Sequence, residues 1–138
     1  MSLERFYAAQ KDSYGQALKE IKNGRKRSHW MWYIFPQIHG LGFSSMSAYY
    51  AIKDLEEAED FLNDPYLGGN LRKISEALLE LDTDDPHRVF GSPDDLKLLS
   101  CMTLFEAVEG RGGVFTRVIE KYYKGRRDRK TVEILGKE

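Results

Sequence analysis

Apolar residues recur with a helical period near the start of the chain. Tyr14, Leu18 and Ile21 follow an i, i+4, i+7 spacing, and Gly24 comes next in the position of a helix C-cap. This pattern predicts an amphipathic helix over residues 12–23.

The same period is clearest in the middle of the chain, where five apolar residues fall on one helical face: Leu67, Leu71, Ile74, Leu78 and Leu81. We therefore expect a core helix here. The acidic segment before it carries a narrower apolar stripe, made of Leu55, Ala58, Phe61 and Leu62. Its helix should end before Asp64-Pro65, because the residue that precedes a proline is driven out of α geometry.

Further helices are expected toward the C-terminus. Ser92-Pro93-Asp94-Asp95 combines an N-cap serine, a proline at the first helical position and acids at the positive end of the helix dipole. The helix that follows carries Leu98, Met102 and Phe105. After the glycine-rich stretch 110–113, apolar spacing predicts two more helices, one with Phe115, Val118, Ile119 and Tyr122 that ends at Gly125, and a short one with Val132 and Leu135.

Residues 28–35 are ambiguous, because a short aromatic run suits either a buried strand or a buried helical turn. Ser28 could cap a helix, Pro36 could end one, and the neighbouring segments are helical, so we favour a short helix. Residues 40–43 then form a loop, and Ser44 or Ser45 begins a short helix that runs through Ala51. The whole pattern predicts an all-α fold: a single compact orthogonal array of about six to eight helices, in one domain of residues 1–138.

Composition supports a globular chain. With 41% apolar and 31% charged residues, the 138-residue chain is too hydrophobic for a disordered segment and too charged for a membrane protein. It shows no apolar run long enough to span a bilayer and no secretory signal, so we expect a cytoplasmic protein without a membrane partner. The lone Cys101 agrees, because small secreted domains usually carry an even set of cysteines.

The charges are balanced overall but not along the chain. There are 21 basic and 22 acidic residues, so no net field draws the protein onto nucleic acid, which is not an expected partner. Six acidic residues gather between 54 and 64, and eight basic residues gather between 111 and 130. Such runs are typical of solvated helix faces.

The most function-like feature is the stretch His29-Trp30-Met31-Trp32-Tyr33-Ile34-Phe35-Pro36-Gln37. It supplies ring faces for stacking, imidazole nitrogens and an amide within nine residues. Most of its large apolar side chains are typical of a helical core. His29, Trp32 and Gln37 are the candidates for a site, because their polar groups need partners if they are buried.

A second candidate is the loop Gly40-Leu41-Gly42, which leads into Ser44-Ser45-Met46-Ser47. Free backbone N–H groups and hydroxyls at a helix start are typical of a small anion site, although a tight turn with a capped helix explains the pattern more simply. The loop lacks the third glycine of a dinucleotide-binding motif and the Gly-Lys-Ser/Thr ending of a P-loop. Ser44 is the ligand-binding candidate of this segment.

A third candidate is the helix after Ser92, which places Asp94, Lys97 and Cys101 along one face. Asp94 and Lys97 are most simply a surface ion pair. Ser100 and Thr103 lie among apolar neighbours, where a hydroxyl either bonds to a carbonyl or lines a polar cavity. Cys101 has no activating base in the sequence and is expected to be a buried apolar residue.

Metal ions and cofactors are not predicted. His29, His39 and His87 lack metal-ligand spacing, and the aspartates between 82 and 85 lack the glycine and the terminal glutamate of a calcium loop.

Together the motifs resemble a bacterial domain family of unknown function that is sometimes labelled "calpastatin". The resemblance covers nearly the whole chain and rests on the stretch from His29 to Gln37, Gly40-Leu41-Gly42 with Ser44, Tyr66-Leu67-Gly68, and Phe90-Gly91-Ser92-Pro93-Asp94 with Lys97, Ser100 and Met102-Thr103-Leu104-Phe105. It implies a small all-α protein and brings no established activity. The label does not suit a globular composition, because calpastatin itself is a disordered inhibitor.

The chain departs from the family pattern at one place that bears on function. Where the family usually reads Leu-Gly-x-Arg-Leu, this chain reads Leu67-Gly68-Gly69-Asn70-Leu71, so an arginine suited to anion binding is absent. Arg72 points elsewhere on a helix. A looser analogy links the chain to small helical domains that process ADP-ribose conjugates.

Three functions are compatible with these features. The first is a site for a small anionic metabolite, of the nucleotide or ADP-ribose-like class, in an enzyme or a binding protein. There Trp32 stacks a ring, Gln37, Ser44 and Ser100 hold polar groups, Lys97 balances an anion, and His29 or Asp94 serves as acid or base; this requires one shared pocket. The second is a protein-interaction domain that uses the acidic face or an exposed aromatic patch. The third is single-stranded nucleic-acid binding by Arg25-Lys26-Arg27 beside the aromatics.

Overall fold

The chain folds into α-helices joined by short loops, as the apolar spacing predicts. A computed structural model describes residues 3–137, and within this range it contains nine helices and no strand. The helices are α1 (Glu4–Lys22), α2 (Met31–Ile34), α3 (Ser45–Tyr50), α4 (Leu55–Asn63), α5 (Pro65–Leu79), α6 (Pro86–Phe90), α7 (Asp94–Glu109), α8 (Val114–Tyr123) and α9 (Arg129–Leu135). Among the described residues, none of these helices is both long and apolar enough to cross a bilayer.

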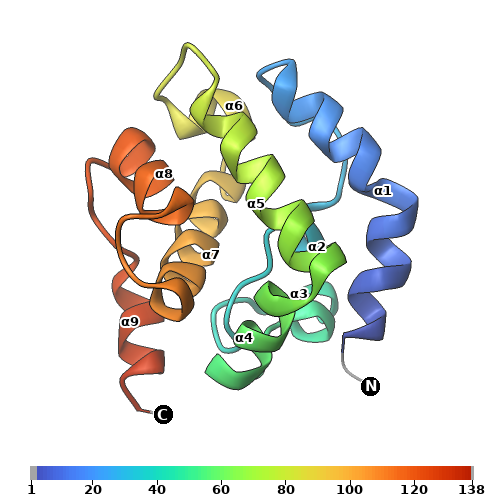
Figure 1. The fold of residues 1–138 in the computed structure, drawn as a ribbon, viewed down its shortest axis with the longest axis vertical. Helices are drawn as coiled ribbons and strands as arrows, with labels where there is room; N and C mark the ends of the chain where they lie inside the picture. The colour runs from blue at the N-terminus through green and yellow to red at the C-terminus, as the bar shows by residue number, and fades with distance from the viewer. Residues whose placement is uncertain (1–2, 138) are drawn as a thin grey trace.

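The central helix of the array is α5, which packs against α1, α4 and α8 and runs between α1 and α8 in Figure 1. The sequence predicts only that the preceding helix ends before Asp64-Pro65, whereas in the structure the same two residues also start α5: the Asp64 carboxylate accepts the N–H groups of Tyr66 and Leu67, and Pro65 lies in the first turn. Its predicted inner face is buried at Leu67, Leu71, Ile74 and Leu78. The fifth predicted position, Leu81, lies beyond the end of the helix and is half-buried.

A second buried helix, α7, packs against α4, α6, α8 and α9. Its apolar side chains join those of the other long helices in one core. The polar groups that it buries have partners: the Thr103 hydroxyl accepts the N–H of Asp128 at 3.0 Å, and the Glu106 carboxylate accepts both Arg127 and the Thr116 hydroxyl. These bonds tie the turn before α9 to the core, because an unpaired buried polar group would cost stability.

The structure differs from the sequence predictions at four helix starts. α2 begins at Met31 with Trp30 in the N-cap position, so Ser28 does not cap it. α1 begins at Glu4 rather than near residue 12, because its inner face includes Phe6 and the polar Gln10, whose amide donates to the Tyr33 carbonyl at 2.8 Å. α7 begins one residue late, with Pro93 rather than Ser92 in the N-cap position. The short helix α6 was not predicted, although Asp85 accepts the N–H of His87 and caps it.

Candidate functional site

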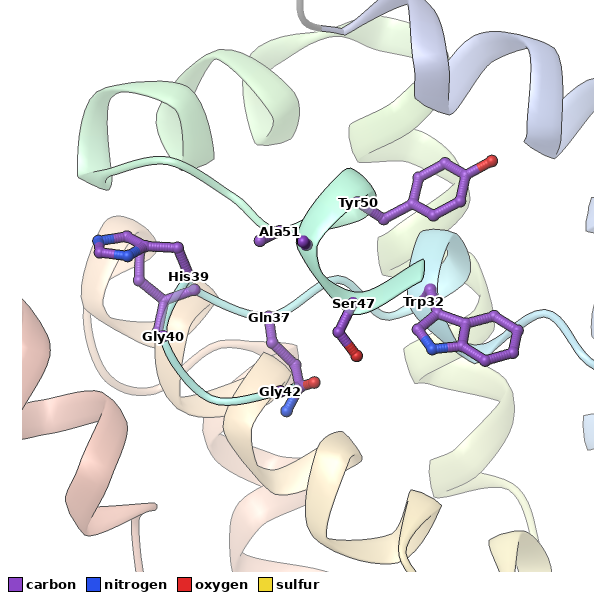
Figure 2. A pocket seen from close by; sticks show the side chains of 10 residues that line it. Trp32, Gln37, His39, Gly40, Gly42, Ser47, Tyr50 and Ala51 are labelled. Carbon is purple, nitrogen blue, oxygen red and sulfur yellow. The ribbon is translucent and has the colours of Figure 1, made fainter. Parts of the chain in front are cut away.

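Two pockets adjoin the segment that leads from α2 through α3. The larger, of about 570 Å³, lies between this segment, the start of α7 and the start of α9, and we call it the α3–α7 pocket. It is lined by Gln37, Gly40, Leu41, Phe43, Ser44, Ser47, Pro93, Leu96, Lys97, Ser100, Asp128 and Lys130. The smaller, of about 210 Å³, has Trp32 in its wall and shares Gln37, Gly40 and Ser47 with the larger, so the two are neighbours (Figure 2).

The segment from Ile38 to Ile52 is a loop closed at its base. Ile38 and Ile52 form a parallel bridge, in which the Ile52 N–H donates to the Gln37 carbonyl at 2.8 Å and the His39 N–H donates to the Ile52 carbonyl at 2.9 Å. Both isoleucines are buried, whereas α3, which the loop carries, has no fully buried residue. The position of α3 therefore depends on polar contacts together with the packing of Tyr50 against Phe6 and Tyr33.

Ser44 is the N-cap of α3, as the sequence predicts. Its hydroxyl oxygen accepts the N–H of Ser47 at 3.1 Å. The turn before it needs a glycine at residue 42, because a Cβ there would lie 2.5 Å from the Ser47 Cβ. The simpler explanation of this motif, a tight turn with a capped helix, is thus part of its role, and the same serine also lines the α3–α7 pocket.

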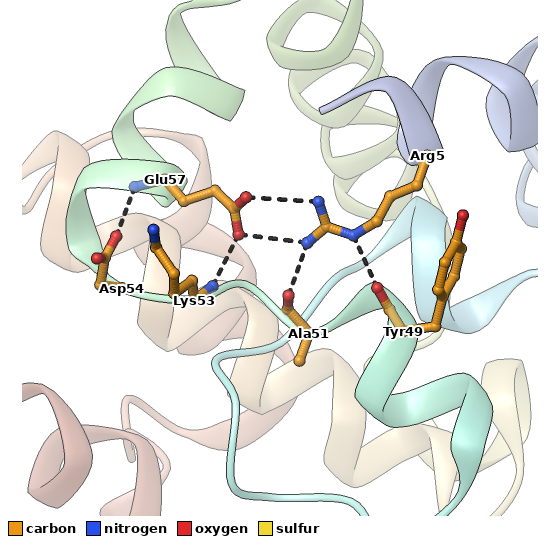
Figure 3. Close-up of polar contacts among 6 residues, drawn as sticks. All are labelled: Arg5, Tyr49, Ala51, Lys53, Asp54 and Glu57. Atoms are coloured by element: carbon orange, nitrogen blue, oxygen red, sulfur yellow. Dashed lines mark hydrogen bonds and ion pairs between the residues drawn. The ribbon is translucent and has the colours of Figure 1, made fainter. Parts of the chain in front are cut away.

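Arg5 holds the other end of α3, as Figure 3 shows. Its guanidinium donates to the carbonyls of Tyr49 and Ala51, each at 2.7 Å, and pairs with the Glu57 carboxylate at 3.2 Å. Glu57 also accepts the N–H of Lys53 at 2.8 Å. Sequence patterning placed Glu57 on a solvated acidic face, but it is buried, because its partner comes from the distant α1.

The approach to α2 is fixed by a buried carboxylate. Glu20 of α1 accepts the backbone N–H groups of Arg27 and Ser28 and the indole N–H of Trp30, at 2.7 to 3.0 Å. The side chains of Gln16 and Ser28 donate to it as well. Trp30 is therefore a core residue, at 1% exposure, as the sequence predicts.

Lys97 is the cation at the meeting point of the motifs. Its ammonium lies 5.5 Å from the centroid of the Trp32 ring, within the range of a cation–π contact, and 3.6 Å from the Asp94 carboxylate. The other oxygen of Asp94 lies 2.9 Å from the ammonium of Lys26. Asp94 thus sits between two lysines, and one face of the Trp32 indole is taken by Lys97.

The remaining predicted polar groups lie on the pocket wall. The Ser100 hydroxyl donates to the Leu96 carbonyl at 3.2 Å, which leaves its oxygen able to accept a further bond. Figure 2 shows the Gln37 and Ser47 side chains directed toward the same opening, whereas the His39 ring points away from them. Hydroxyl and amide groups in one concave surface can orient a polar ligand.

Most of the predicted site residues come together. Gln37, Ser44, Lys97 and Ser100 line the α3–α7 pocket, Trp32 lines its neighbour, and Asp94 contacts Lys97. His29 is different: it is exposed and lines neither pocket, and within the described residues its ring has no hydrogen bond or ion pair.

Sequence reasoning missed other residues of the pocket wall, which are Leu41, Phe43, Leu96, Asp128 and Lys130. The only sequence signal for Lys130 is the basic run between 111 and 130, and nothing local indicates that this run meets the loop after α2. Asn70, where the family has an arginine, donates instead to Gln10 at 3.0 Å, and Arg72 is exposed and pairs with Glu109. Neither residue lines either of the two pockets.

Comparisons with known proteins agree with the motifs. Residues 1–135 match the model of DUF1810, described as a protein of unknown function. The fold matches the crystal structure of the conserved hypothetical protein Rv1873 from Mycobacterium tuberculosis, with a TM-score of 0.90 and 40% identity over 97% of this chain and 96% of that one. No curated protein matches the chain.

Proposed function

The chain belongs to the DUF1810 family, and we propose that it binds a small anionic metabolite of the nucleotide or ADP-ribose-like class in the α3–α7 pocket. One observation carries the proposal. Residues from three motifs line a single cavity of about 570 Å³: Gln37 and Ser44, which are close together in the chain, and the distant pair Lys97 and Ser100. A shared concave site with convergent polar groups is typical of ligand binding.

The chemistry of the pocket wall supports this class of ligand. Lys97 and Lys130 supply two positive charges, which suit a phosphate. Asp128, although its Oδ2 caps α9, has a second carboxylate oxygen that suits a hydroxyl or an amine of a ribose or base. Leu41 and Leu96 supply apolar surface for a ring face. A nucleotide combines these three kinds of group in one molecule.

The contacts of the polar residues favour binding over proton transfer. Asp94 is held between Lys26 and Lys97, so its carboxylate is engaged by two cations rather than turned toward the pocket as a base. His29 lies outside the pocket wall. We therefore assign Asp94 and Trp32 the role of positioning Lys97, and we assign no reaction.

Titration calorimetry and thermal denaturation with AMP, ADP and ADP-ribose test the proposal, with adenosine as the uncharged comparison. A ligand present at 100 times its Kd should add about 2.7 kcal/mol to the free energy of unfolding. Lys97→Met should weaken binding at least tenfold, because it removes the cation. Lys73→Met is the matched control, since Lys73 is exposed and lines neither pocket.

Two results would overturn the proposal: none of the three anionic ligands binds more tightly than adenosine, or the two lysine variants lose affinity equally. Circular dichroism should first confirm that both variants fold.

A protein partner is the second candidate, because three apolar side chains of the loop and α3 are exposed, namely Phe43, Met46 and Tyr49. Phe43 is fully exposed and also stands at the wall of the α3–α7 pocket. If its surface serves the metabolite, Phe43→Ala should weaken ligand binding. If ligand binding is unchanged by that substitution, the Phe43 ring does not contribute to the metabolite site, and a protein partner remains its candidate contact.

A further inference from the structure

A second concave site lies where the loop after α1 meets α6. It has a volume of about 260 Å³ and is lined by Arg25, Lys26 and residues 87–91. The Lys26 N–H donates to the Val89 carbonyl at 2.8 Å, and the Arg25 N–H donates to the Glu20 carbonyl at 3.1 Å. The bond between Lys26 and Val89 joins the two sides of the site, and the bond between Arg25 and Glu20 fixes the loop at the end of α1. We call the site the basic cleft.

The basic cleft concentrates positive charge. Four of its lining residues carry basic groups, Arg25, Lys26, His87 and Arg88, and no acidic residue lines it within the part of the chain that the structure describes. Asp94 balances Lys26 at 2.9 Å and the Asp95 carboxylate lies 3.6 Å from the His87 ring, so the uncompensated charge is that of the two arginines. Arg25 and Arg88 are exposed, and neither guanidinium has a hydrogen bond or ion pair to another described residue. This contrasts with Arg5 and Arg127, whose guanidinium groups pair with buried glutamates.

Helix dipoles give an alternative explanation for these cations. α1 ends at Lys22 and α6 at Phe90, so both present the negative ends of their dipoles near the cleft. α6, however, has only five residues, so its dipole is small. One cation at each helix end would be enough to balance the negative ends of the two dipoles. The two unpaired guanidinium groups on facing segments are more than the helix dipoles require. Each planar guanidinium can donate two parallel hydrogen bonds to the oxygens of a phosphate.

We infer that the basic cleft binds a phosphate group, either as inorganic phosphate or as the phosphate of a small monoester. Arg25 and Arg88 supply the bidentate donors, and Lys26, whose charge Asp94 balances at 2.9 Å, lines the same cleft. The site is separate from the α3–α7 pocket, because the two share no lining residue.

The test is a phosphate titration followed by two-dimensional NMR and calorimetry at constant ionic strength, with chloride as the reference anion. Backbone amides of residues 25–26 and 87–91 should shift. The double variant Arg25→Gln/Arg88→Gln should bind phosphate at least tenfold more weakly. Both arginines are exposed, so the double variant should fold. The matched control is Arg126→Gln/Lys73→Gln, which removes two exposed charges outside the cleft and should keep wild-type affinity.

Parallel titrations with methyl phosphate distinguish a monoester from the free anion, since a monoester site should prefer methyl phosphate. The inference is overturned if phosphate binds no better than chloride, if the double variant and the control lose affinity equally, or if the shifts map to residues 40–47 and 97–100. Affinity that rises with the length of a single-stranded oligonucleotide would also overturn it, because that marks an extended nucleic-acid surface. The two sites are followed at different amides, residues 25–26 and 87–91 for the cleft and residues 40–47 and 97–100 for the α3–α7 pocket, so this inference and the proposed function fail separately.

Discussion

Single residues show how buried charge is used in this protein. The carboxylate of Glu20 lies almost fully inside the molecule and accepts hydrogen bonds from the loop that leads to α2. Burial by itself raises the pKa of this group. The hydrogen bonds from Ser28, Gln16, the Arg27 N–H and Trp30 outweigh burial and lower the pKa from 4.5 to about 2.

This shift predicts an acid-dependent loss of stability. Because the pKa is lower in the folded state, the contribution of Glu20 is present above about pH 4.5 and is lost as the pH falls toward 2. Glu20→Gln should lower the free energy of unfolding at pH 7 by about 2 kcal/mol, since its amide places a donor against other donors. The variant should also depend less on pH between 4.5 and 2.

Urea denaturation across this pH range measures both effects. Glu59→Gln is the control, because Glu59 is exposed on α4, and it should behave like the wild type. If the free energy of unfolding falls with pH in the same way for Glu20→Gln and the wild type, Glu20 is not the source of the pH dependence of stability.

At the scale of helices, the crossing of α4 and α5 depends on the absence of one side chain. A Cβ at Gly68 would lie 1.9 Å from the Leu62 carbonyl oxygen, which belongs to the backbone and cannot move aside cheaply. At the next residue, Gly69, a Cβ would meet nothing within 4 Å. Two adjacent glycines of one helix therefore have different reasons to be there.

Alanine substitutions should separate the two glycines. Gly68→Ala should destabilise the protein by about 3 kcal/mol, because the overpacked helices must move apart. Gly69→Ala should stabilise it by about 0.5–1 kcal/mol, because alanine is the better helix former and its methyl group meets open space. Thermal or urea denaturation measures both, and each variant is the control for the other. A destabilisation of equal size in both variants would contradict the packing argument.

At the scale of the whole molecule, the candidate site is assembled by contacts between distant parts of the chain. α1 supplies Arg5, which holds the end of α3, and α4 supplies Glu57, which holds Arg5. α3 buries no residue fully, so these bonds should decide how well it is ordered.

Arg5→Met should therefore affect the site as well as stability. We expect a loss of about 3 kcal/mol, because the buried Glu57 loses its cation, and faster hydrogen exchange at the amides of residues 45–52. The Arg5→Met variant should also bind the anionic metabolite more weakly, because α3 carries part of the pocket wall. In the control Arg117→Met the broken pair, with Glu76, is exposed, and the loss should stay below about 1 kcal/mol. Unchanged exchange in α3 would show that Arg5 does not order it.

The sequence by itself determined the all-α class and most of the helices. The cap of α3 at Ser44 follows from a hydrogen bond that spans three residues, so neighbouring side chains suffice to predict it. The sequence also identified Gln37 and Ser100 as polar groups that need partners if they are buried, and Lys97 as the cation of a candidate site.

Only the tertiary structure decided which partners those groups have. The early start of α1 was missed because Gln10 is polar, and its partner, the Tyr33 carbonyl, is reached only when α1 and α2 pack. Lys26 pairs with Asp94 through the same kind of long-range contact, and Lys130 lines the same pocket as Lys97. Helix formation depends on the spacing of residues that are close in the sequence, whereas a site depends on which side chains from distant segments lie next to each other once the core is packed.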